Sequence, residues 1–306
     1  MSALRRQQIV SPGGELHAQF VPEAGMVCCS LRRGERELLA PGAGIDAYAE
    51  RGVTMGIPLL YPWANRLAGY TYEAAGRRVS LPRDSPLLPR DPNGLPIHGV
   101  IPGRLHWQTA ADAPSSSIAA SLSWDQPELL ELFPFPHRLS YEATLSDEAL
   151  RIAVTVHADA GPVPVSFGFH PYLALAPGAR AHAEVELPVS SRLVLDDRMI
   201  PTGETVAFAP GRHALGERDW DDAFAGPEPP ATVAVLAGRE RTELEFEQGY
   251  RCSQLYSPRK AGFVCVEPMT APANALVSDR APVLASGASF RASFSVRPAR
   301  AVADSC

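Results

Sequence analysis

The chain has no excess of positive charge and no cluster of it. Lysine and arginine together number 28 against 34 aspartates and glutamates, which gives a formal net charge of -6 and a pI near 5.8. The arginines are scattered along the sequence rather than gathered in one segment. Because a nucleic-acid interface needs a basic face that neutralises phosphates, this charge balance argues against a nucleic-acid partner.

The chain also lacks a long apolar run. Its most apolar stretch, Val163–Pro177, is broken by prolines and by His170, and it is too short and too interrupted to cross a bilayer. Met1–Gly14 contains Arg5 and Arg6 with no apolar segment behind them. We therefore expect no membrane association, no secretory signal and no lipid anchor.

Cysteine is scarce and unpaired in its spacing. There are 5 cysteines, of which Cys28 and Cys29 are adjacent and Cys306 is the last residue. Adjacent cysteines do not form the two-residue-spaced clip that structural zinc sites use, and an odd number suits no disulfide framework. We expect reduced thiols, a cytoplasmic location and no structural metal.

Apolar and polar residues alternate with a period of two in several segments, which is typical of half-buried strands. These segments are Ile118–Trp124, Leu139–Leu145, Leu150–Val156, Thr242–Gln248 and Phe290–Val296. The four residues 146–149 between the second and third segments suit a hairpin. The best helical candidate is one short segment, Gln126–Leu132, so the sequence predicts an all-β, antiparallel fold.

The 30 prolines and 24 glycines fall between the expected strands rather than in one linker. We therefore expect a single domain over residues 1–306, with loose ends at 1–8 and 300–306. Prolines recur through Gly56–Gly103, which predicts a long irregular excursion. Long loops in sheet proteins often carry function.

The first candidate site segment lies at the start of this excursion. In GIPLLYPWANRL, Gly56–Leu67, an apolar segment delivers Trp63, Asn65 and Arg66 together. An aromatic face can pack on a sugar ring, while amide and guanidinium groups can hold its hydroxyls. The alternative is an ordinary loop in which Arg66 pairs with a carboxylate.

Two histidines lie inside apolar runs. His98 occurs in LPIHGV, and His170 occurs in VSFGFHPYLAL directly before Pro171, which holds the backbone of His170 extended. Each could be a structural histidine with satisfied hydrogen bonds. The fixed direction of its side chain makes His170 the stronger functional candidate.

A carboxylate closes another apolar strand. Glu267 follows Phe263–Val266 and precedes Pro268, so its side chain is expected to be buried. Its partner could be an arginine, but a desolvated carboxylate with a raised pKa is also what a general base needs near neutral pH.

Taken together and in this order, these motifs resemble the aldose 1-epimerase family. The matching segments are GIPLLYPWANRL, PIHG, GFHPYL, WDDAF and VCVEP, which span Gly56–Asn274. The resemblance implies a large antiparallel β-sandwich, with His170 as the acid and Glu267 as the base in opening and reclosing a sugar ring. It further implies that Arg66, His98 and Asp221 hold sugar hydroxyls, and that neither a cofactor nor a metal is needed. The family's aspartate motif has a second candidate here, Asp222, although Asp221 fits the alignment.

Three alternatives remain open at this stage. A hexose 6-phosphate could be the substrate if Arg83 and Arg90 bind its phosphate. A sugar-binding or sensing protein could keep the pocket without turnover. A metal-dependent hydrolase could use His98, His170 and a carboxylate, but no two histidines have helical or hairpin ligand spacing. A small sugar is the expected partner, and the chain is expected to be a monomer or a homodimer.

Overall fold

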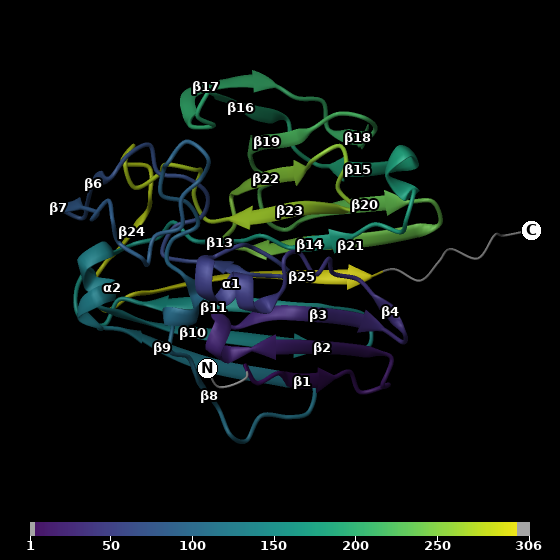
Figure 1. Cartoon of the computed structure of the whole chain (residues 1–306), viewed down its shortest axis with the longest axis horizontal. Coiled ribbons are helices and arrows are strands. Elements are labelled where there is room, and N and C mark those ends of the chain that lie inside the picture. Colours follow the sequence, from purple (N-terminus) through teal and green to yellow (C-terminus); the bar gives the residue numbers. More distant parts are fainter. Residues whose placement is uncertain (1–3, 299–306) are drawn as a thin grey trace, which may run out of the picture.

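The computed structural model describes residues 4–298, and antiparallel strands dominate it (Figure 1). The predicted all-β sandwich is confirmed: large sheets pack face to face, and the helices are few and short. Within the described residues, no helix is long and apolar enough to cross a membrane.

The largest sheet has nine strands. Their order is β18 (Gly211–Ala214), β15 (Ala183–Leu187), β20 (Ala231–Ala237), β21 (Glu240–Gln248), β25 (Ser289–Pro298), β11 (Leu150–His157), β10 (His137–Leu145), β9 (Ser117–Trp124) and β8 (Gln108–Thr109).

The second sheet has eight strands, and its strands β17, β16, β19 and β22 lie in the upper part of Figure 1. Its order is β17 (Pro201–Ala207), β16 (Ser191–Leu195), β19 (Trp220–Ala225), β22 (Cys252–Ser257), β23 (Phe263–Met269), β13 (Gly168–Phe169) and β5 (Leu59–Leu60), and β14 (Tyr172–Ala174) also pairs with β23.

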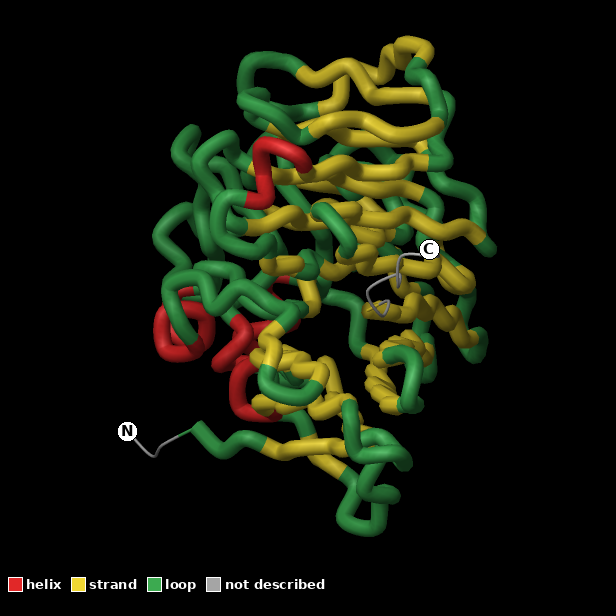
Figure 2. The backbone as a smooth tube through the Cα atoms, turned by 90° about the vertical axis from the view of Figure 1, so that its right-hand side faces the viewer, coloured by secondary structure: helices red, strands yellow, loops and turns green. Residues whose placement is uncertain are grey.

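Smaller elements complete the described chain. One sheet joins β1 (Gln7–Val10), β2 (Leu16–Val21), β3 (Val27–Arg33) and β4 (Arg36–Glu37), and two-stranded sheets join β6 (Thr71–Ala74) to β7 (Arg77–Ser80) and β12 (Val163–Pro164) to β24 (Val283–Leu284). The helices are α1 (Ile45–Arg51) and α2 (Pro127–Leu132), with 3-10 turns η1 (Pro22–Ala24), η2 (Pro102–Arg104) and η3 (Ala179–His182). Figure 2 shows that many of the loops gather at one end of the stacked strands.

Aromatic side chains hold the sheets together. Phe169 of β13 contacts Phe294 of β25 with ring centroids 5.0 Å apart, which joins the two largest sheets. Phe20 of β2 contacts Tyr141 of β10 at 6.2 Å, which joins the four-stranded sheet to the largest one. Burying such rings contributes apolar area and favourable edge-to-face geometry.

The five strands predicted from alternation are confirmed, and they are consecutive neighbours in the nine-stranded sheet, from β21 through β25, β11 and β10 to β9. The predicted hairpin is also present, with Leu145 opposite Leu150. In β10, buried and more exposed residues alternate along the whole strand, as a sheet with one covered face requires. The predicted helix is α2, which begins at Pro127 after the N-cap residue Gln126.

Three expectations need correction. The helix α1 was not predicted, because its seven residues follow Gly44, which offers no side-chain cap. Gln7 and Gln8, expected to be loose, pair with Phe20 and Gln19 in β1. Of the other residues expected to be loose, 1–3 and 300–306 lie outside the described residues. The third correction concerns residues 56–103, which are not irregular throughout, because they contain the short strands β5, β6 and β7.

Gly99 fixes the turn that follows His98. Its φ is +77°, and a Cβ atom placed on it would lie 1.9 Å from the carbonyl oxygen of Tyr61. Gly94, in the same loop, has a φ of +74° but no atom within 4 Å of such a Cβ. Substitutions at these two glycines therefore distinguish the cost of backbone strain from the cost of a steric clash.

We expect Gly99→Ala to lower the free energy of unfolding by about 2–4 kcal/mol, since it adds an overpacking cost to the strain of a left-handed alanine. Gly94→Ala should cost only about 1 kcal/mol. Urea unfolding of both variants measures the difference. Equal losses would mean that the loop moves away from Tyr61 without cost.

Candidate active site

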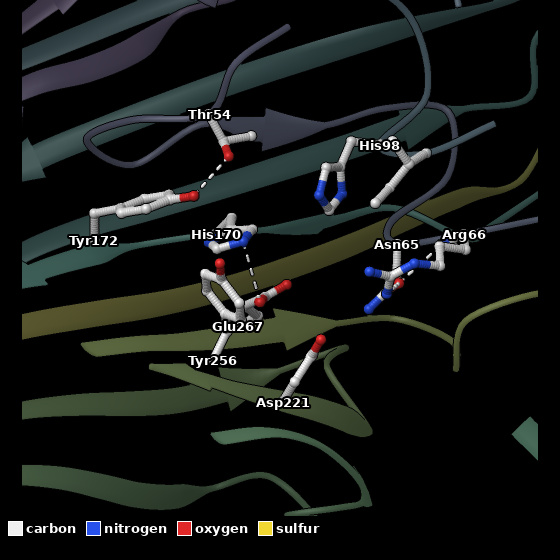
Figure 3. A pocket seen from close by; sticks show the side chains of 10 residues that line it. Thr54, Asn65, Arg66, His98, His170, Tyr172, Asp221, Tyr256 and Glu267 are labelled. Atoms are coloured by element: carbon white, nitrogen blue, oxygen red, sulfur yellow. Dashed lines mark hydrogen bonds and ion pairs between the residues drawn. The ribbon is translucent and has the colours of Figure 1, made fainter. Parts of the chain in front are cut away.

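One cavity collects the candidate residues from segments that are far apart in the sequence (Figure 3). Its volume is about 170 Å³. Pockets for drug-sized ligands usually measure about 300–1,000 Å³, so this one suits a smaller molecule. Its lining consists of Thr54, Asn65, Arg66, Ile97, His98, His170, Tyr172, Asp221, Tyr256 and Glu267.

His170 follows the short strand β13, which lies between β23 and β5. The backbone N–H of His170 donates to the carbonyl oxygen of Pro58 at 3.2 Å. Its ring stacks on Tyr172, with centroids 4.6 Å apart and planes 9° apart, and meets Tyr256 edge-on at 5.8 Å. The imidazole is therefore held in one direction by backbone and by packing.

Glu267 reaches the same point from β23, and His170 Nε2 lies 3.3 Å from Glu267 Oε1. The two side chains are 6% and 2% exposed. Within residues 4–298, neither His170 Nδ1 nor Glu267 Oε2 has a hydrogen-bond partner although both atoms are buried. Unpaired buried polar atoms are costly, so their concentration here points to a ligand-binding role.

Burial shifts the proton affinities of both groups toward their uncharged forms. Loss of solvent lowers the pKa of His170 to about 3, and the positive charge of Arg66 acts in the same direction. Loss of solvent raises the pKa of Glu267 well above its usual range; the charge of Asp221 adds to this and that of Arg66 opposes it. A buried acid–base pair with opposite shifts is a common feature of catalytic sites.

Asn65, Arg66 and His98 form a second group, on the side of the cavity away from Tyr172 (Figure 3). Asn65 and His98 have φ values of +57° and +61°, and the N–H of His98 donates to the carbonyl oxygen of Asn65 at 3.0 Å. Asn65 Oδ1 accepts from Arg66 Nη1 at 3.1 Å. Strained non-glycine residues of this kind persist where the surroundings hold them, often at functional sites.

Asp221 and its neighbour Asp222 face opposite sides of β19. Asp221 lines the cavity and accepts a hydrogen bond from Gln254 Nε2. Asp222 instead pairs with Arg192 at 2.8 Å and with Arg218 at 2.5 Å. Because side chains alternate along a strand, only one of the two can reach the cavity.

The structure corrects the assignment of Trp63. Its side chain is fully buried in the hydrophobic core and does not line the cavity, so it cannot pack on a sugar ring there. The apolar residues that surround it in the sequence place it in the core. The aromatic rings at the cavity are Tyr172 and Tyr256 instead.

Four lining residues were not predicted as site residues. Tyr172 and Ile97 lie within the recognised motifs but carried no assigned role, while Thr54 and Tyr256 lie outside them. Thr54 reaches Tyr172 through a hydrogen bond of 2.6 Å between their hydroxyl groups. The sequence held no signal for Tyr256, which shares one face of β22 with Gln254, the hydrogen-bond partner of Asp221.

The two loop arginines considered for a phosphate lie elsewhere. Arg90 donates to the carbonyl oxygens of Leu88, Ser85 and Arg83, and Arg83 covers the ring of Tyr70 at 4.4 Å. Neither arginine lines the cavity. Among residues 4–298, no group of three or more His, Cys, Asp or Glu side chains is placed to hold a metal ion.

A comparison with models of protein families assigns the chain to a family. The sequence model of the family described as aldose 1-epimerase matches residues 21–297, which include every lining residue of the cavity. The chain belongs to the aldose 1-epimerase family. No curated protein matches this family member at the level of sequence.

Solved structures agree on the fold of this aldose 1-epimerase family member. The Slr1438 protein of Synechocystis sp. PCC 6803 has 20% identity and a TM-score of 0.78, with 97% of this chain and 96% of that one covered. The GalM/aldose epimerase homologue of C. elegans has 19% identity and a TM-score of 0.78, with 97% and 99% covered. A galactose mutarotase-like protein of Clostridium acetobutylicum has 15% identity and a TM-score of 0.79, with 97% and 98% covered.

Proposed function

We propose that this protein interconverts the α and β anomers of a free aldose, with His170 as the acid and Glu267 as the base. The observation that carries the proposal is the buried contact of 3.3 Å between His170 Nε2 and Glu267 Oε1, on a cavity whose other polar groups suit sugar hydroxyls. A protein that only binds a sugar needs no such acid–base pair.

The reaction follows from the two groups. Glu267 takes the proton of the C1 hydroxyl, the electron pair left on that oxygen forms the C1 carbonyl, and the bond from C1 to the ring oxygen breaks. His170 gives its proton to the ring oxygen. The open aldehyde then turns about the C1–C2 bond, and reversal of both proton transfers recloses the ring on the other face. Each proton transfer contributes about a hundred- to ten-thousandfold in rate.

The pair needs one shared proton for this chemistry. The uncharged forms that burial favours are a neutral His170 and a protonated Glu267. The reactive form, a protonated His170 beside an ionised Glu267, holds the same number of protons and differs only in where one of them lies. Substrate binding therefore need not change the net protonation of the pair.

Activity should depend on the number of protons that His170 and Glu267 hold together. Since the pKa of His170 is lowered to about 3, the pair gains a second proton only in strong acid. We expect kcat/KM to stay within about threefold between pH 7 and pH 5, after subtraction of the uncatalysed rate, since kcat/KM reports groups of the free enzyme. A decline centred near pH 6.5 would show that His170 titrates like an exposed histidine, and would contradict the proposed proton count.

The charges on the cavity favour a neutral substrate over a phosphorylated one. Two carboxyl groups, Asp221 and Glu267, line it, and its arginine, Arg66, already pairs with Asp91. Arg83 and Arg90, the candidates for a phosphate site, bind elsewhere in their loop. A dianionic phosphate would therefore meet two carboxyl groups and one cation, Arg66, whose Nε is already paired with Asp91.

The two neighbouring aspartates give a paired test of the hydroxyl-binding group. Asp221→Asn should lower kcat/KM about 10- to 100-fold, because it removes a charged acceptor for a sugar hydroxyl. Asp222→Asn should lower the melting temperature, since it weakens the contacts with Arg192 and Arg218, and leave kcat/KM within about threefold. The reverse pattern of kinetic effects would place Asp222, and not Asp221, against the substrate.

We also propose that the chain is a single domain, a monomer or homodimer, that works in the cytoplasm without cofactor or metal. One continuous hydrophobic cluster, from Ile9 to Val296, supports the single domain.

The proposed function is tested by NMR exchange spectroscopy with glucose, galactose, xylose, arabinose and the 6-phosphates of the two hexoses. At least one free sugar should exchange its anomers faster than in buffer. Exchange confined to the phosphates, and removed by Arg83→Ala or Arg90→Ala, would reject the neutral substrate.

A further inference from the structure

Asp91 does not line the cavity but pairs with Arg66, which does, and its side chain is only 1% exposed. Each of its two carboxylate oxygens has a separate set of donors. Oδ2 accepts from Arg66 Nε at 2.9 Å. Oδ1 accepts from the backbone N–H groups of Asn93 and Leu95, each at 2.9 Å.

The contacts of Oδ1 shape the loop that carries His98. The N–H of Asp91 donates back to the carbonyl oxygen of Leu95 at 3.0 Å, which closes the turn. Directly after this turn, Ile97 and His98 enter the cavity. Carboxylates that accept backbone N–H groups two residues on are a common way to fix a turn.

The contact of Oδ2 reaches a different segment and fixes a side chain. Asn65 Oδ1 already holds Nη1 of Arg66, and the N–H of Asn274 donates to its backbone carbonyl at 2.8 Å. With Nε held by Asp91 as well, the plane of the guanidinium is set. Figure 3 shows this group directed from the side of Asn65 toward the cavity.

We propose that Asp91 is a positioning residue for sugar binding: it orients the Arg66 guanidinium toward the substrate and ties it to the loop that presents His98. The proposal rests on the proposed function, because Arg66 is taken to hold a sugar hydroxyl. A charge-assisted hydrogen bond to a planar guanidinium supplies direction as well as energy, and a misplacement of about 1 Å in a binding group can cost about a hundredfold in rate.

The chain provides a matched control. Asp196 makes the same turn, with Oδ1 accepting from the N–H groups of Arg198 and Ile200 at 2.9 Å and its own N–H donating to the carbonyl oxygen of Ile200 at 2.9 Å. It lies after β16 and does not line the cavity. Asp196→Asn therefore measures the effect of the substitution on such a turn, together with the loss of a partly exposed contact of 3.5 Å between Arg198 Nη2 and Asp196 Oδ2.

The test substitutes Asp91→Asn, which keeps one oxygen for the turn and replaces Oδ2 by an amide that cannot accept from Arg66. The first readout is the Nε–H resonance of Arg66, identified by its absence in Arg66→Lys. It should be protected from exchange with water in the wild type and in Asp196→Asn, and lost in Asp91→Asn. A retained, protected signal in Asp91→Asn would overturn the proposal.

The second readout is the dissociation constant of a sugar, measured by NMR titration with the aldose that exchanges fastest, or with glucose if none does. We expect it to rise about 10- to 100-fold in Asp91→Asn and to stay within twofold of the wild type in Asp196→Asn. In the Arg66→Lys background, Asp91→Asn should add less than threefold, because the group it orients is gone. An unchanged dissociation constant in Asp91→Asn would overturn the proposal.

Two further outcomes are informative. If Asp91→Asn does not fold, the Arg66→Lys variant tests the proposal instead. Lysine keeps the positive charge but lacks the Nε–H that Asp91 holds, so full sugar affinity in this variant would show that the orientation of the guanidinium is unimportant. A wild type that binds sugar without exchanging its anomers would reject the proposed function and leave the positioning role to be judged on affinity. Absence of sugar binding altogether would overturn both.

Discussion

Glu267→Gln should reduce anomer exchange by at least about a hundredfold while the protein stays folded. Glutamine keeps the shape of the side chain and one acceptor oxygen, but it cannot take the proton of the C1 hydroxyl. The change removes the base without opening a cavity beside His170. NMR exchange spectroscopy or polarimetry at neutral pH measures the loss.

The Glu267→Gln variant should lose activity without losing stability. Burial raises the pKa of Glu267, so the folded state disfavours the ionised carboxylate. The free energy of unfolding therefore declines as the pH rises from the unfolded-state pKa of this group toward its folded-state pKa. Removing the carboxyl should leave the melting temperature unchanged or raise it. The control is Glu245→Gln, which should keep full activity. Glu245 lies on β21, and its carboxylate pairs with Arg297. A Glu267→Gln variant with near wild-type exchange would show that another group removes the proton.

His170→Asn should also reduce exchange by at least about a hundredfold. Asparagine retains a hydrogen-bond donor, but it cannot deliver a proton to the ring oxygen near neutral pH. His213→Asn is the control, because His213 lies on β18 and contacts the carbonyl oxygen of Ala209 rather than the cavity. Circular dichroism checks that each variant is folded.

The double variant His170→Asn, Glu267→Gln distinguishes concerted from independent roles. Because both proton transfers belong to one ring-opening event, its loss should be far smaller than the product of the two single losses. A large loss for Glu267→Gln with a small one for His170→Asn would instead assign the acid to His98, whose ring centroid lies 5.5 Å from that of His170.

The sequence predicted five strands, and in two of them the two faces clearly differ in burial. β9 and β10 alternate between buried and more exposed residues, so their period of two is visible without a structure. Strands such as β5 and β13 are two residues long and buried throughout, and they offer no alternation to detect. Yet β13 directly precedes His170, so the local frame of the site could not be derived from pattern alone.

The candidate site residues were predictable where a chemical group stands out against its surroundings. Glu267 and His170 are polar groups inside apolar runs, and the structure brings them together. Trp63 illustrates the opposite case, because an aromatic residue inside an apolar run is equally suited to the core, and that is where it lies. Asp91 and Tyr256 gave no signal, since their importance depends on contacts with residues remote in the sequence.

The most direct test of the account is anomer exchange of free aldoses, measured by NMR on the wild type and on the double variant His170→Asn, Glu267→Gln at equal concentration. We expect at least one unphosphorylated aldose to exchange faster with the wild type than in buffer, and the folded double variant to remove this acceleration. Equal rates with both proteins, for every aldose, would contradict the proposed function.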